Sequence, residues 1–441
     1  MEPEIRFLIG ALNHSDVNVR LDSLRQLMSS VKSGELEKPV TGKDVNNHIH
    51  TTYSFSPYSP TKAVWTAYTA GLAAAGIMDH DSIGGAQEFI EAGIIAGMAT
   101  TIGLECRTDF SKTSLNGRRI NNPDQDSVAY VALHGIPHTQ IVKVKEFFKP
   151  YTKHRNLRNA KMVTKINKLI ESLGIVLDFE KDVIPLSSFE GGGSITERHI
   201  LYALTLKLIG LKGKGLSMVD FLKKQLKLNV SAKAEGLLTD FSNPHYEYDL
   251  LGLLKSELVA GIYIKATDEC PDIMEFLQFS DSIGAISSYA YLGDVADSVT
   301  GDKKTQKFED DYIEELFDLI HHLGFKAVTY MPSRNSMSQL DKVRALCGKY
   351  SFFQISGEDI NSSRQSFICM ALRNEKFRNL YDATWALIGH ELAATEHLNA
   401  SMFSLHTVGK YPSLEQRIMV YRDIGLSMDW TREGVPVMNQ L

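Results

Sequence analysis

The sequence predicts an α/β protein in which parallel strands alternate with helices. Two observations support this class. Short strand-like runs alternate with helical patterns over residues 41–139, and the same alternation resumes over 259–441. The intervening residues 140–258 are mainly helical in pattern, and residues 1–40 form a short helical lead. We therefore expect one α/β body that is interrupted by a helical insertion and preceded by helices packed against it.

Local signals place the elements before the insertion. Asp16 caps a helix in the lead. Ser59 caps the next helix, which begins with Pro60, is expected to extend through Ala75 and is stopped by Gly76. The strands expected in this part lie at 47–51, 76–80, 101–106 and 126–133, with a further helix through 89–94.

Longer helical patterns mark the insertion, at residues 155–173 and 196–209. The second pattern begins at Ser194-Ile195-Thr196-Glu197, which has the form of a capping box with Ser194 as the cap. Three glycines at 191–193 predict a flexible join before it. After the insertion, strands are expected at 259–265, 282–291, 326–330 and 351–356, followed by a long apolar helix over 383–403.

The composition is that of an ordinary soluble globular protein, since 43% of the 441 residues are hydrophobic and 23% are charged. No apolar run is long enough to span a bilayer, and the apolar stretch near the N-terminus is too short for a signal peptide. The four cysteines are scattered, which favours reduced thiols over disulfides or a cysteine metal site. We therefore expect a cytoplasmic protein that does not contact membranes.

The charge is distributed unevenly along the chain. The net charge is −6, but residues 139–245 hold 18 Lys/Arg against 10 Asp/Glu. This basic segment either steers an anionic substrate toward a cleft or consists of solvated, lysine-rich helices, and the pattern leaves both open. The basicity and the aromatic content are too low for a nucleic-acid-binding protein. We expect no nucleic-acid partner beyond a possible nucleotide substrate.

A metal site is indicated by two histidines, His48 and His50, which alternate on an extended segment and so point to one side. Such a pair can clamp a metal ion, although it also arises by chance. Three other strand ends carry suitable side chains: Asp79 and His80, then Glu105, and finally Asp359. Because barrel enzymes place their active sites at the carboxyl ends of the strands, we expect these side chains to form one site.

Five short segments form a series along the chain: His48-Ile49-His50-Thr51, Met78-Asp79-His80-Asp81, Gly103-Leu104-Glu105, Ile195–Ile200 and Ile355-Ser356-Gly357-Glu358-Asp359. Together they resemble the motif series of the polymerase-and-histidinol-phosphatase (PHP) family, and the resemblance covers most of residues 45–400. It implies a distorted (β/α)7 TIM-like barrel with up to three metal ions and, most often, phosphoesterase activity. It also implies that Glu105 is the bridging carboxylate.

The chain departs from the family's pattern at several ligand positions. Phe55 stands in place of an aspartate, whereas Ala129 or Tyr130, Tyr291 and Asn361 stand in place of histidines. The set that remains is His48, His50, Glu105 and Asp359. The resemblance therefore implies one divalent ion, zinc, manganese or iron, rather than three. His134, Tyr291 and Asn361 are possible replacements for the lost ligands.

With one ion, protein groups would have to take over the roles of the missing metals. His80, which can titrate near neutrality, and Asp79 beside it are the expected catalytic residues. A phosphoryl group needs fixed positive charge, so we expect cationic side chains near it. The candidates for binding this anion are Arg198, His199, Lys265 and Arg364.

Three functions are compatible with these residues. We expect first a metal-dependent phosphoesterase of EC 3.1 type, which acts on a small phosphorylated metabolite or nucleotide through a metal-activated water. The lost ligands keep two alternatives open: a metal-dependent hydrolase of C–N or C–O bonds on the same barrel, or a non-catalytic binding or regulatory protein. Retention of four compatible ligands argues against the last.

Overall fold

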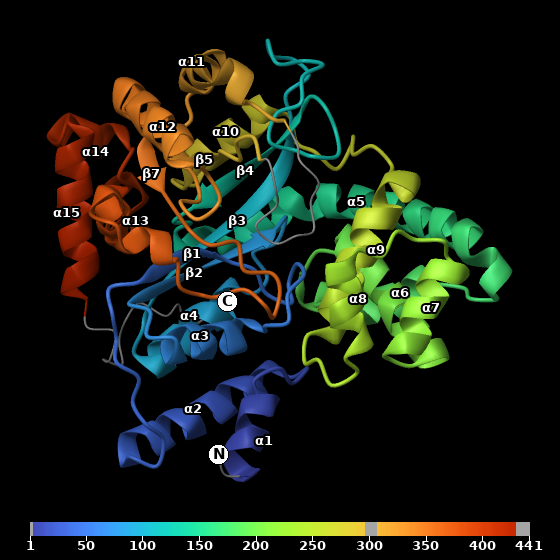
Figure 1. Cartoon of the computed structure of the whole chain (residues 1–441). Helices are drawn as coiled ribbons and strands as arrows, with labels where there is room; N and C mark the ends of the chain where they lie inside the picture. Colours follow the sequence, from blue (N-terminus) through green and yellow to red (C-terminus); the bar gives the residue numbers. More distant parts are fainter. Residues whose placement is uncertain (1–2, 296–306, 429–441) are drawn as a thin grey trace.

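Seven strands form one curled sheet, in the order in which they follow along the chain (Figure 1). The computed structural model describes residues 3–295 and 307–428. The strands are β1 (Val45–Ile49), β2 (Ala74–His80), β3 (Ala99–Asp109), β4 (Val128–His134), β5 (Ile286–Ala290), β6 (Ala327–Thr329) and β7 (Phe353–Ile355). A mixed α/β fold with this curled sheet confirms the predicted distorted TIM-like barrel.

The sheet is parallel on both sides of one antiparallel strand. β1, β2 and β3 pair in parallel, as do β5, β6 and β7, whereas β4 runs antiparallel to β3 and β5. The expectation of a wholly parallel sheet was therefore wrong at β4. Residues 110–127, which join β3 to β4, contain no helix, and parallel neighbours need a crossover that is usually helical.

The sheet curls until its first and last strands approach each other. Ile49 of β1 forms a parallel bridge with Ile360, which follows β7. The His50 amide donates to the Ile360 carbonyl at 2.9 Å, and the Ile360 amide donates to the His48 carbonyl at 3.1 Å. These bonds fix the His48–His50 segment beside Asp359.

Helices cover the outer face of the sheet. The apolar sides of most of them and the strands form the largest core cluster, in which Phe89, Phe276 and Phe317 are fully buried. These helices are α3 (Pro60–Thr69), α4 (Ala86–Ala96), α10 (Ile273–Ser282), α11 (Ile313–Leu323), α12 (Met337–Tyr350) and α13 (Arg378–Glu396). Two further helices follow, α14 (Leu405–Lys410) and α15 (Leu414–Ser427), and α15 packs on α13 in a separate cluster. No helix in the described ranges is long and apolar enough to cross a membrane.

Two helices form the N-terminal lead, α1 (Pro3–Ala11) and α2 (Val17–Ser33). They lie below α3 and α4 in the view of Figure 1. The Asp16 side chain caps α2 by accepting from the Asn18 amide at 2.8 Å. Arg20 forms a buried two-point pair with Glu88 of α4, at 2.8 and 2.5 Å. The lead is therefore anchored to the barrel by charge as well as by apolar contact.

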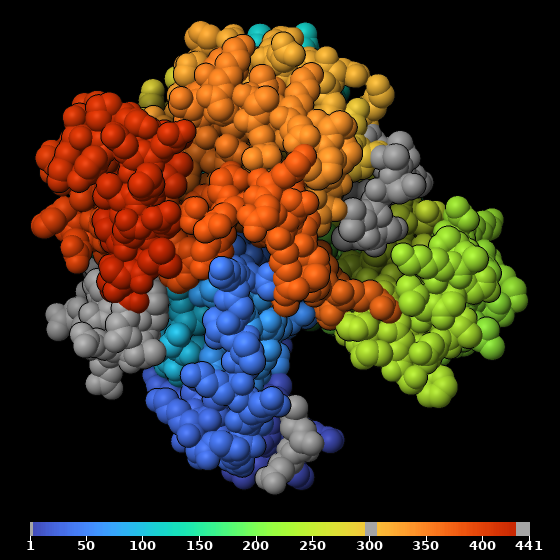
Figure 2. Space-filling model, turned by 60° about the vertical axis from the view of Figure 1, so that its left-hand side comes forward, coloured from blue at the N-terminus to red at the C-terminus, as the bar shows by residue number. Residues whose placement is uncertain are grey.

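A group of helices between β4 and β5 packs around a core cluster of its own, in which Leu204, Leu250 and Leu254 are fully buried. They lie to one side of the sheet, in green and yellow (Figures 1 and 2). The group comprises α5 (Ile141–Ile170), α6 (Glu197–Lys212), α7 (Leu216–Lys224), α8 (Ala232–Thr239) and α9 (Tyr246–Ile262).

The helix that begins at Pro60 is shorter than expected. It ends at Thr69, and Gly71 follows with φ +79°, a left-handed conformation that glycine adopts without strain. Ala75 and Gly76 therefore lie in β2, not in or after the helix. A Cβ on Gly76 would lie 2.9 Å from the Cα of Asn47, so this glycine permits close packing of β2 on β1.

Two further expectations were wrong around the insertion. The strand expected at 259–265 is absent, because α9 continues to residue 262 and buries its apolar side in the insertion's own cluster. Tertiary packing here outweighs the β propensity of the sequence. Ser194 is not the cap of α6: Thr196 takes that place, while the Ser194 hydroxyl donates to the His80 carbonyl at 2.5 Å.

Helices α13 and α15 cross in close contact at two glycines. A Cβ on Gly389 would lie 1.9 Å from the Tyr421 carbonyl oxygen, and a Cβ on Gly425 would lie 2.2 Å from that of Trp385. Real Cβ atoms do not approach backbone so closely, so either substitution would force the helices apart.

We expect Gly389→Ala to lower the free energy of unfolding by about 1–3 kcal/mol, because this crossing cannot relax without moving a backbone. Gly252→Ala in α9 is the matched control, since nothing lies within 4 Å of its Cβ position. Alanine there should stabilise the helix by about 0.5–1 kcal/mol. Urea unfolding of both variants measures the difference, and a Gly389→Ala variant as stable as the parent would contradict the packing described.

Candidate metal centre

Four strands bring histidine and carboxylate side chains to one region of the sheet, although Glu105 lies inside β3 and not at the strand end that the sequence predicted, because β3 continues to Asp109. His48 lies in β1, and His50 follows it directly. His80 ends β2 and is paired in register with Glu105 of β3. Asp359 follows β7 and is fixed beside β1 by the bridge that closes the sheet. The chain therefore assembles five potential metal ligands in one region.

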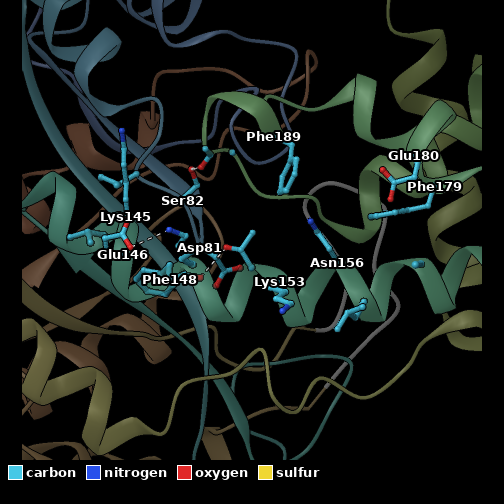
Figure 3. A pocket seen from close by; sticks show the side chains of 18 residues that line it. Asp81, Ser82, Lys145, Glu146, Phe148, Lys153, Asn156, Phe179, Glu180 and Phe189 are labelled. Carbon is cyan, nitrogen blue, oxygen red and sulfur yellow. Dashed lines mark hydrogen bonds and ion pairs between the residues drawn. The ribbon is translucent and has the colours of Figure 1, made fainter. Parts of the chain in front are cut away.

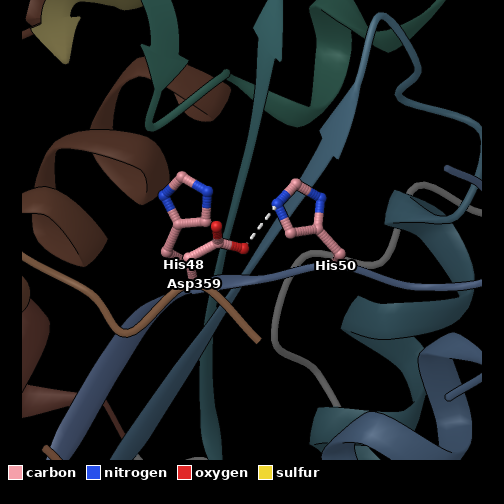
Figure 4. A group of neighbouring side chains, drawn as sticks. All are labelled: His48, His50 and Asp359. Atoms are coloured by element: carbon pink, nitrogen blue, oxygen red, sulfur yellow. Dashed lines mark ion pairs between the residues drawn. The ribbon is translucent and has the colours of Figure 1, made fainter. Parts of the chain in front are cut away.

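The donor atoms of these side chains face one another. Nε2 of His50 lies 3.3 Å from Oε1 of Glu105 and 3.2 Å from Oδ1 of Asp359. The same Glu105 oxygen lies 3.6 Å from Nε2 of His48 and 3.1 Å from Nδ1 of His80. In Figure 4 the Asp359 carboxylate lies between the rings of His48 and His50. The donor atoms form two overlapping groups of three that are close enough to bind a cation: His48, His50 and Asp359, and His50, His80 and Glu105.

Two of the ring nitrogens face only carboxylates. Nε2 of His48 and Nε2 of His50 are buried, lie 3.2–3.6 Å from oxygens of Glu105 and Asp359, and make no hydrogen bond to any other residue that the structure describes. Zinc, manganese and iron all accept imidazole and carboxylate ligands. The side chains therefore fit a divalent metal ion.

Ser54 and Asp79 orient the ring of His50 through its Nδ1 atom. Its Nδ1 lies 3.2 Å from the Ser54 hydroxyl, which donates its proton to Asp79 at 2.6 Å. Because Ser54 has one proton to give, its oxygen accepts from His50 Nδ1, and Nε2 is left to face the carboxylates. Asp79 also accepts from the amide and hydroxyl of Thr51 and is fully buried. The expectation of a catalytic Asp79 was therefore wrong: it positions His50 and does not line the cavity.

The carboxylates control the charge of the site. Burial opposes charge on His50, but hydrogen bonds to Asp359 and Glu105 outweigh it and raise the pKa of His50 to about 10. Despite burial, the facing histidines hold the pKa of Asp359 and of Glu105 well below their usual range. Both carboxylates are ionised at neutral pH and offer negative charge to a cation, whose binding would displace the His50 proton.

His80 does not have the near-neutral pKa that the sequence analysis expected. Burial lowers its pKa to about 3, so the ring is neutral at pH 7 and does not titrate near neutrality. A neutral imidazole is the form that binds metal. Together with the distance to Glu105, this favours His80 as a further ligand rather than an acid–base catalyst.

Asn361 supports a ligand and does not replace one. Its Nδ2 donates to Oδ1 of Asp359 at 2.6 Å, and its Oδ1 accepts from Arg198 at 2.9 Å. Arg198 is thereby held at the cavity wall, and its binding of an anion stays a prediction. The two residues fix the orientation of the Asp359 carboxylate.

Three other expected anion-binding residues lie elsewhere. His199 is buried, and its Nδ1 accepts from the Thr196 amide at 3.0 Å at the start of α6. Lys265 is exposed and does not line the cavity. Arg364 donates twice to Asp249, at 2.7 Å each, and also lies off the cavity wall. Residue type alone suggested these positions, and the fold directs their side chains away.

The two remaining replacement candidates differ in their surroundings. His134 ends β4, is buried off the cavity wall, and burial lowers its pKa to about 3; its Nε2 makes no hydrogen bond to a described residue. Tyr291 does line the cavity, but its hydroxyl donates to Asp310 at 2.5 Å. The Tyr291 hydroxyl proton is therefore used in the hydrogen bond to Asp310.

A cavity of about 630 Å³ opens onto the metal-binding side chains. This volume is within the range of small-molecule sites. Apart from the proposed ligands, five cationic and two acidic side chains line it: Arg107, Arg155, Arg198, Lys255 and Arg334, with Asp124 and Glu197. The wall therefore favours an anionic ligand.

A buried network of charges beside the cavity was not predicted. Glu269 contacts Arg107, lies 2.5 Å from Nε of Arg158 and 3.7 Å from Nε of Arg155. Arg107 also lies 3.2 Å from Glu197. One signal was available, because Arg107 follows Glu105 by two residues on β3 and so shares its face. The acidic partners come from distant segments and gave no local signal.

One carboxyl group near the cavity wall makes stability depend on pH. Glu309 is fully buried and accepts from the Leu292 amide at 2.9 Å and the Tyr289 hydroxyl at 3.2 Å. Burial raises its pKa from 4.5 to about 7. The folded state therefore binds this proton more tightly than the unfolded state does. The resulting gain in the free energy of unfolding is fully present below pH 4.5 and is lost as the pH rises through 7. Glu309→Gln should flatten this part of the stability–pH curve; an unchanged slope in urea unfolding between pH 5 and 8 would contradict it.

Comparisons with known proteins identify no family. No family model matches the sequence, and no curated protein matches it. Two solved structures are similar in fold. A proposed metal-dependent phosphoesterase from Bifidobacterium adolescentis has a TM-score of 0.48 and 17% identity, covering 76% of this chain and 96% of that one. An amidohydrolase from Chromobacterium violaceum with bound sulfate and no metal has a TM-score of 0.47 and 14% identity, covering 74% and 90%.

Proposed function

We propose that this chain is a metal-dependent hydrolase whose ion is held by His48, His50, Glu105 and Asp359. One observation carries the proposal: two buried imidazole nitrogens face two ionised carboxylates at the mouth of a cavity and make no hydrogen bond to any other described residue. Imidazole and carboxylate donors converging at one edge of a cavity are the ligands that divalent transition metals prefer.

The proposed cofactor is a single zinc, manganese or iron ion. When bound, such an ion supplies a Lewis acid and lowers the pKa of a bound water to about 7. Ser54 and Asp79 hold the His50 ring, Asn361 holds Asp359, and His80 adds a neutral imidazole beside Glu105. These contacts would therefore hold the proposed ligand side chains in position before a metal ion binds.

The proposed reaction is hydrolysis of a phosphate ester in a small metabolite or nucleotide. The excess of cationic side chains on the cavity wall supports an anionic substrate. Arg198 is the best placed of them, because Asn361 holds it next to Asp359. Its planar guanidinium suits two-point contact with a phosphoryl group.

Metal analysis of the purified chain and an activity panel test this proposal. We expect about one equivalent of transition metal and hydrolysis of phosphomonoesters or nucleotides, lost with a chelator and restored by metal. A metal-free chain that cannot be reconstituted and hydrolyses nothing would refute it.

A second candidate is hydrolysis of C–N or C–O bonds on the same barrel. It is favoured by the pairing of Arg107 with Glu269 and Glu197, and of Arg155 with Asp81, which compensates part of the positive charge. Turnover of amides or lactones that is unaffected by Arg198→Ala would support it. Stabilisation by metal without turnover of any substrate would instead support a non-catalytic binding protein.

Ser54→Ala should lower metal affinity by about 10–100-fold, the usual effect of removing a group that orients a ligand. The substitution removes the hydroxyl between His50 and Asp79 without touching a ligand. Ser56→Ala, on the same turn, is the control because its hydroxyl accepts only a weak bond from the Tyr58 amide at 3.4 Å. Competition with a fluorescent metal chelator measures both affinities; equal values in the two variants would exclude the proposed role of Ser54.

A further inference from the structure

A second cavity, of about 550 Å³, lies apart from the metal centre and shares no lining residue with the first. α5 forms one wall, the turn at 81–83 forms another, and the segment 179–193 completes it. The Ser82 hydroxyl donates to the Gly192 carbonyl at 2.8 Å and so ties the turn to this segment. In Figure 3, α5 runs across the view with Phe189 above it and Phe179 toward one end.

The walls of this cavity are largely apolar. Phe148 of α5 lines it together with Phe179 and Phe189 of the segment 179–193 and with Ile83 of the turn. Leu157 of α5 also lines it and keeps 53% of its surface exposed, although it is a large apolar side chain. Covering this surface would be favourable, at roughly 25 cal/mol per Å². The cavity therefore suits an apolar body.

Positive charge lies along the same helix. Lys145, Lys149 and Lys153 line the cavity at four-residue spacing, which places them on one face of α5. Lys149 pairs with Glu146 at 3.4 Å. Within the described part of the chain, Lys145 and Lys153 form neither an ion pair nor a side-chain hydrogen bond. Of the other acidic residues, Glu180 lies beside Phe179 (Figure 3), and Asp81 is neutralised by Arg155.

A polar group that follows Lys153 on α5 also lacks a partner among the described residues. Asn156 lines the cavity, and its carboxamide oxygen is buried without a hydrogen bond among the described residues. A carboxamide can turn either its acceptor or its NH₂ donor toward a ligand. A ligand head group held by the lysines could accept a hydrogen bond from it.

We propose that this cavity binds an amphipathic anion, with an acyl or aromatic body and one carboxylate, sulfonate or phosphate head. The body covers Leu157 and the phenylalanine rings. The head lies between Lys145 and Lys153 on α5. This site needs no metal ion, so it stands independently of the proposed hydrolase function.

Titration of the full chain with the fluorescent anion 8-anilinonaphthalene-1-sulfonate tests the proposal. We expect one saturable site, at least tenfold weaker binding in the double variant Lys145→Glu/Lys153→Glu, and loss of binding in Ala160→Trp, which fills the cavity. Lys161→Glu/Lys168→Glu is the matched control, with two exposed lysines of the same helix that do not line the cavity. Decanoate should displace the dye, and decanol at the same concentration should not.

Equal binding by the Lys145/Lys153 variant and its control would overturn the proposal, and so would equal displacement by decanol and decanoate. Both lysines are exposed, so we expect the Lys145→Glu/Lys153→Glu variant to fold. It therefore still tests the proposal if Ala160→Trp does not fold. The titration is repeated with chelator: binding that persists separates this site from the metal centre, and binding that requires metal overturns it.

Discussion

His50→Ala is expected to remove the bound metal ion and to reduce hydrolysis to background. Nε2 of His50 lies within 3.3 Å of both Glu105 and Asp359, so no other donor atom contacts both carboxylates as directly. Its loss leaves two ionised carboxylates facing each other without the ring between them. Metal content and turnover should therefore both fall. We expect turnover of the best substrate in the panel to fall by about 100-fold or more.

The control for this variant is His406→Ala, an exposed histidine on α14 far in sequence from the site. It should retain metal and activity. A His50→Ala protein that binds metal with unchanged affinity would place the ion elsewhere. One that loses metal but keeps its activity would show that hydrolysis does not depend on this centre.

Glu269→Ala is expected to lower the free energy of unfolding by about 3–5 kcal/mol, the usual cost of leaving buried charge uncompensated. Glu269 is almost fully buried and is shared by Arg107, Arg155 and Arg158. Without it, Arg107 loses its closest carboxylate, and Arg158 keeps only its contact with Glu197. Because Arg107 and Arg155 line the cavity, the variant should also alter KM for an anionic substrate at temperatures where it remains folded.

Glu146→Ala provides the comparison, because it removes an exposed carboxylate paired with Lys149. Exposed pairs contribute about 0–1 kcal/mol, so its unfolding in urea should match the parent closely. If Glu269→Ala were no more destabilising than this control, the buried network would not hold the cavity wall as described.

The sequence located the proposed metal-binding side chains because they depend on local signals. His48 and His50 alternate on an extended segment, Glu105 lies on the next-but-one strand, and Asp359 follows the last strand, so the sheet brings them to one region. The structure places the four together, whereas their binding of a metal stays a prediction. Asp79 was misassigned because spacing does not reveal that its carboxylate turns inward to Thr51 and Ser54.

Features set by distant contacts could not be predicted. The partners of Arg107 are 90 and 162 residues away, so no window of sequence joins them. Lys265 and Arg364 carry the right charge, but their direction depends on where α9 ends and on Asp249. The extension of α9 follows from packing that outweighs local propensity, whereas the reversal of β4 follows from a connection that contains no helix.

Anomalous diffraction from crystals grown with zinc or manganese tests the central claim most directly. The account predicts one strong peak at about 2.0–2.2 Å from Nε2 of His48, Nε2 of His50 and the carboxylates of Glu105 and Asp359. A crystal of the metal-loaded chain with no peak at these side chains, or with its peak at other residues, would contradict it.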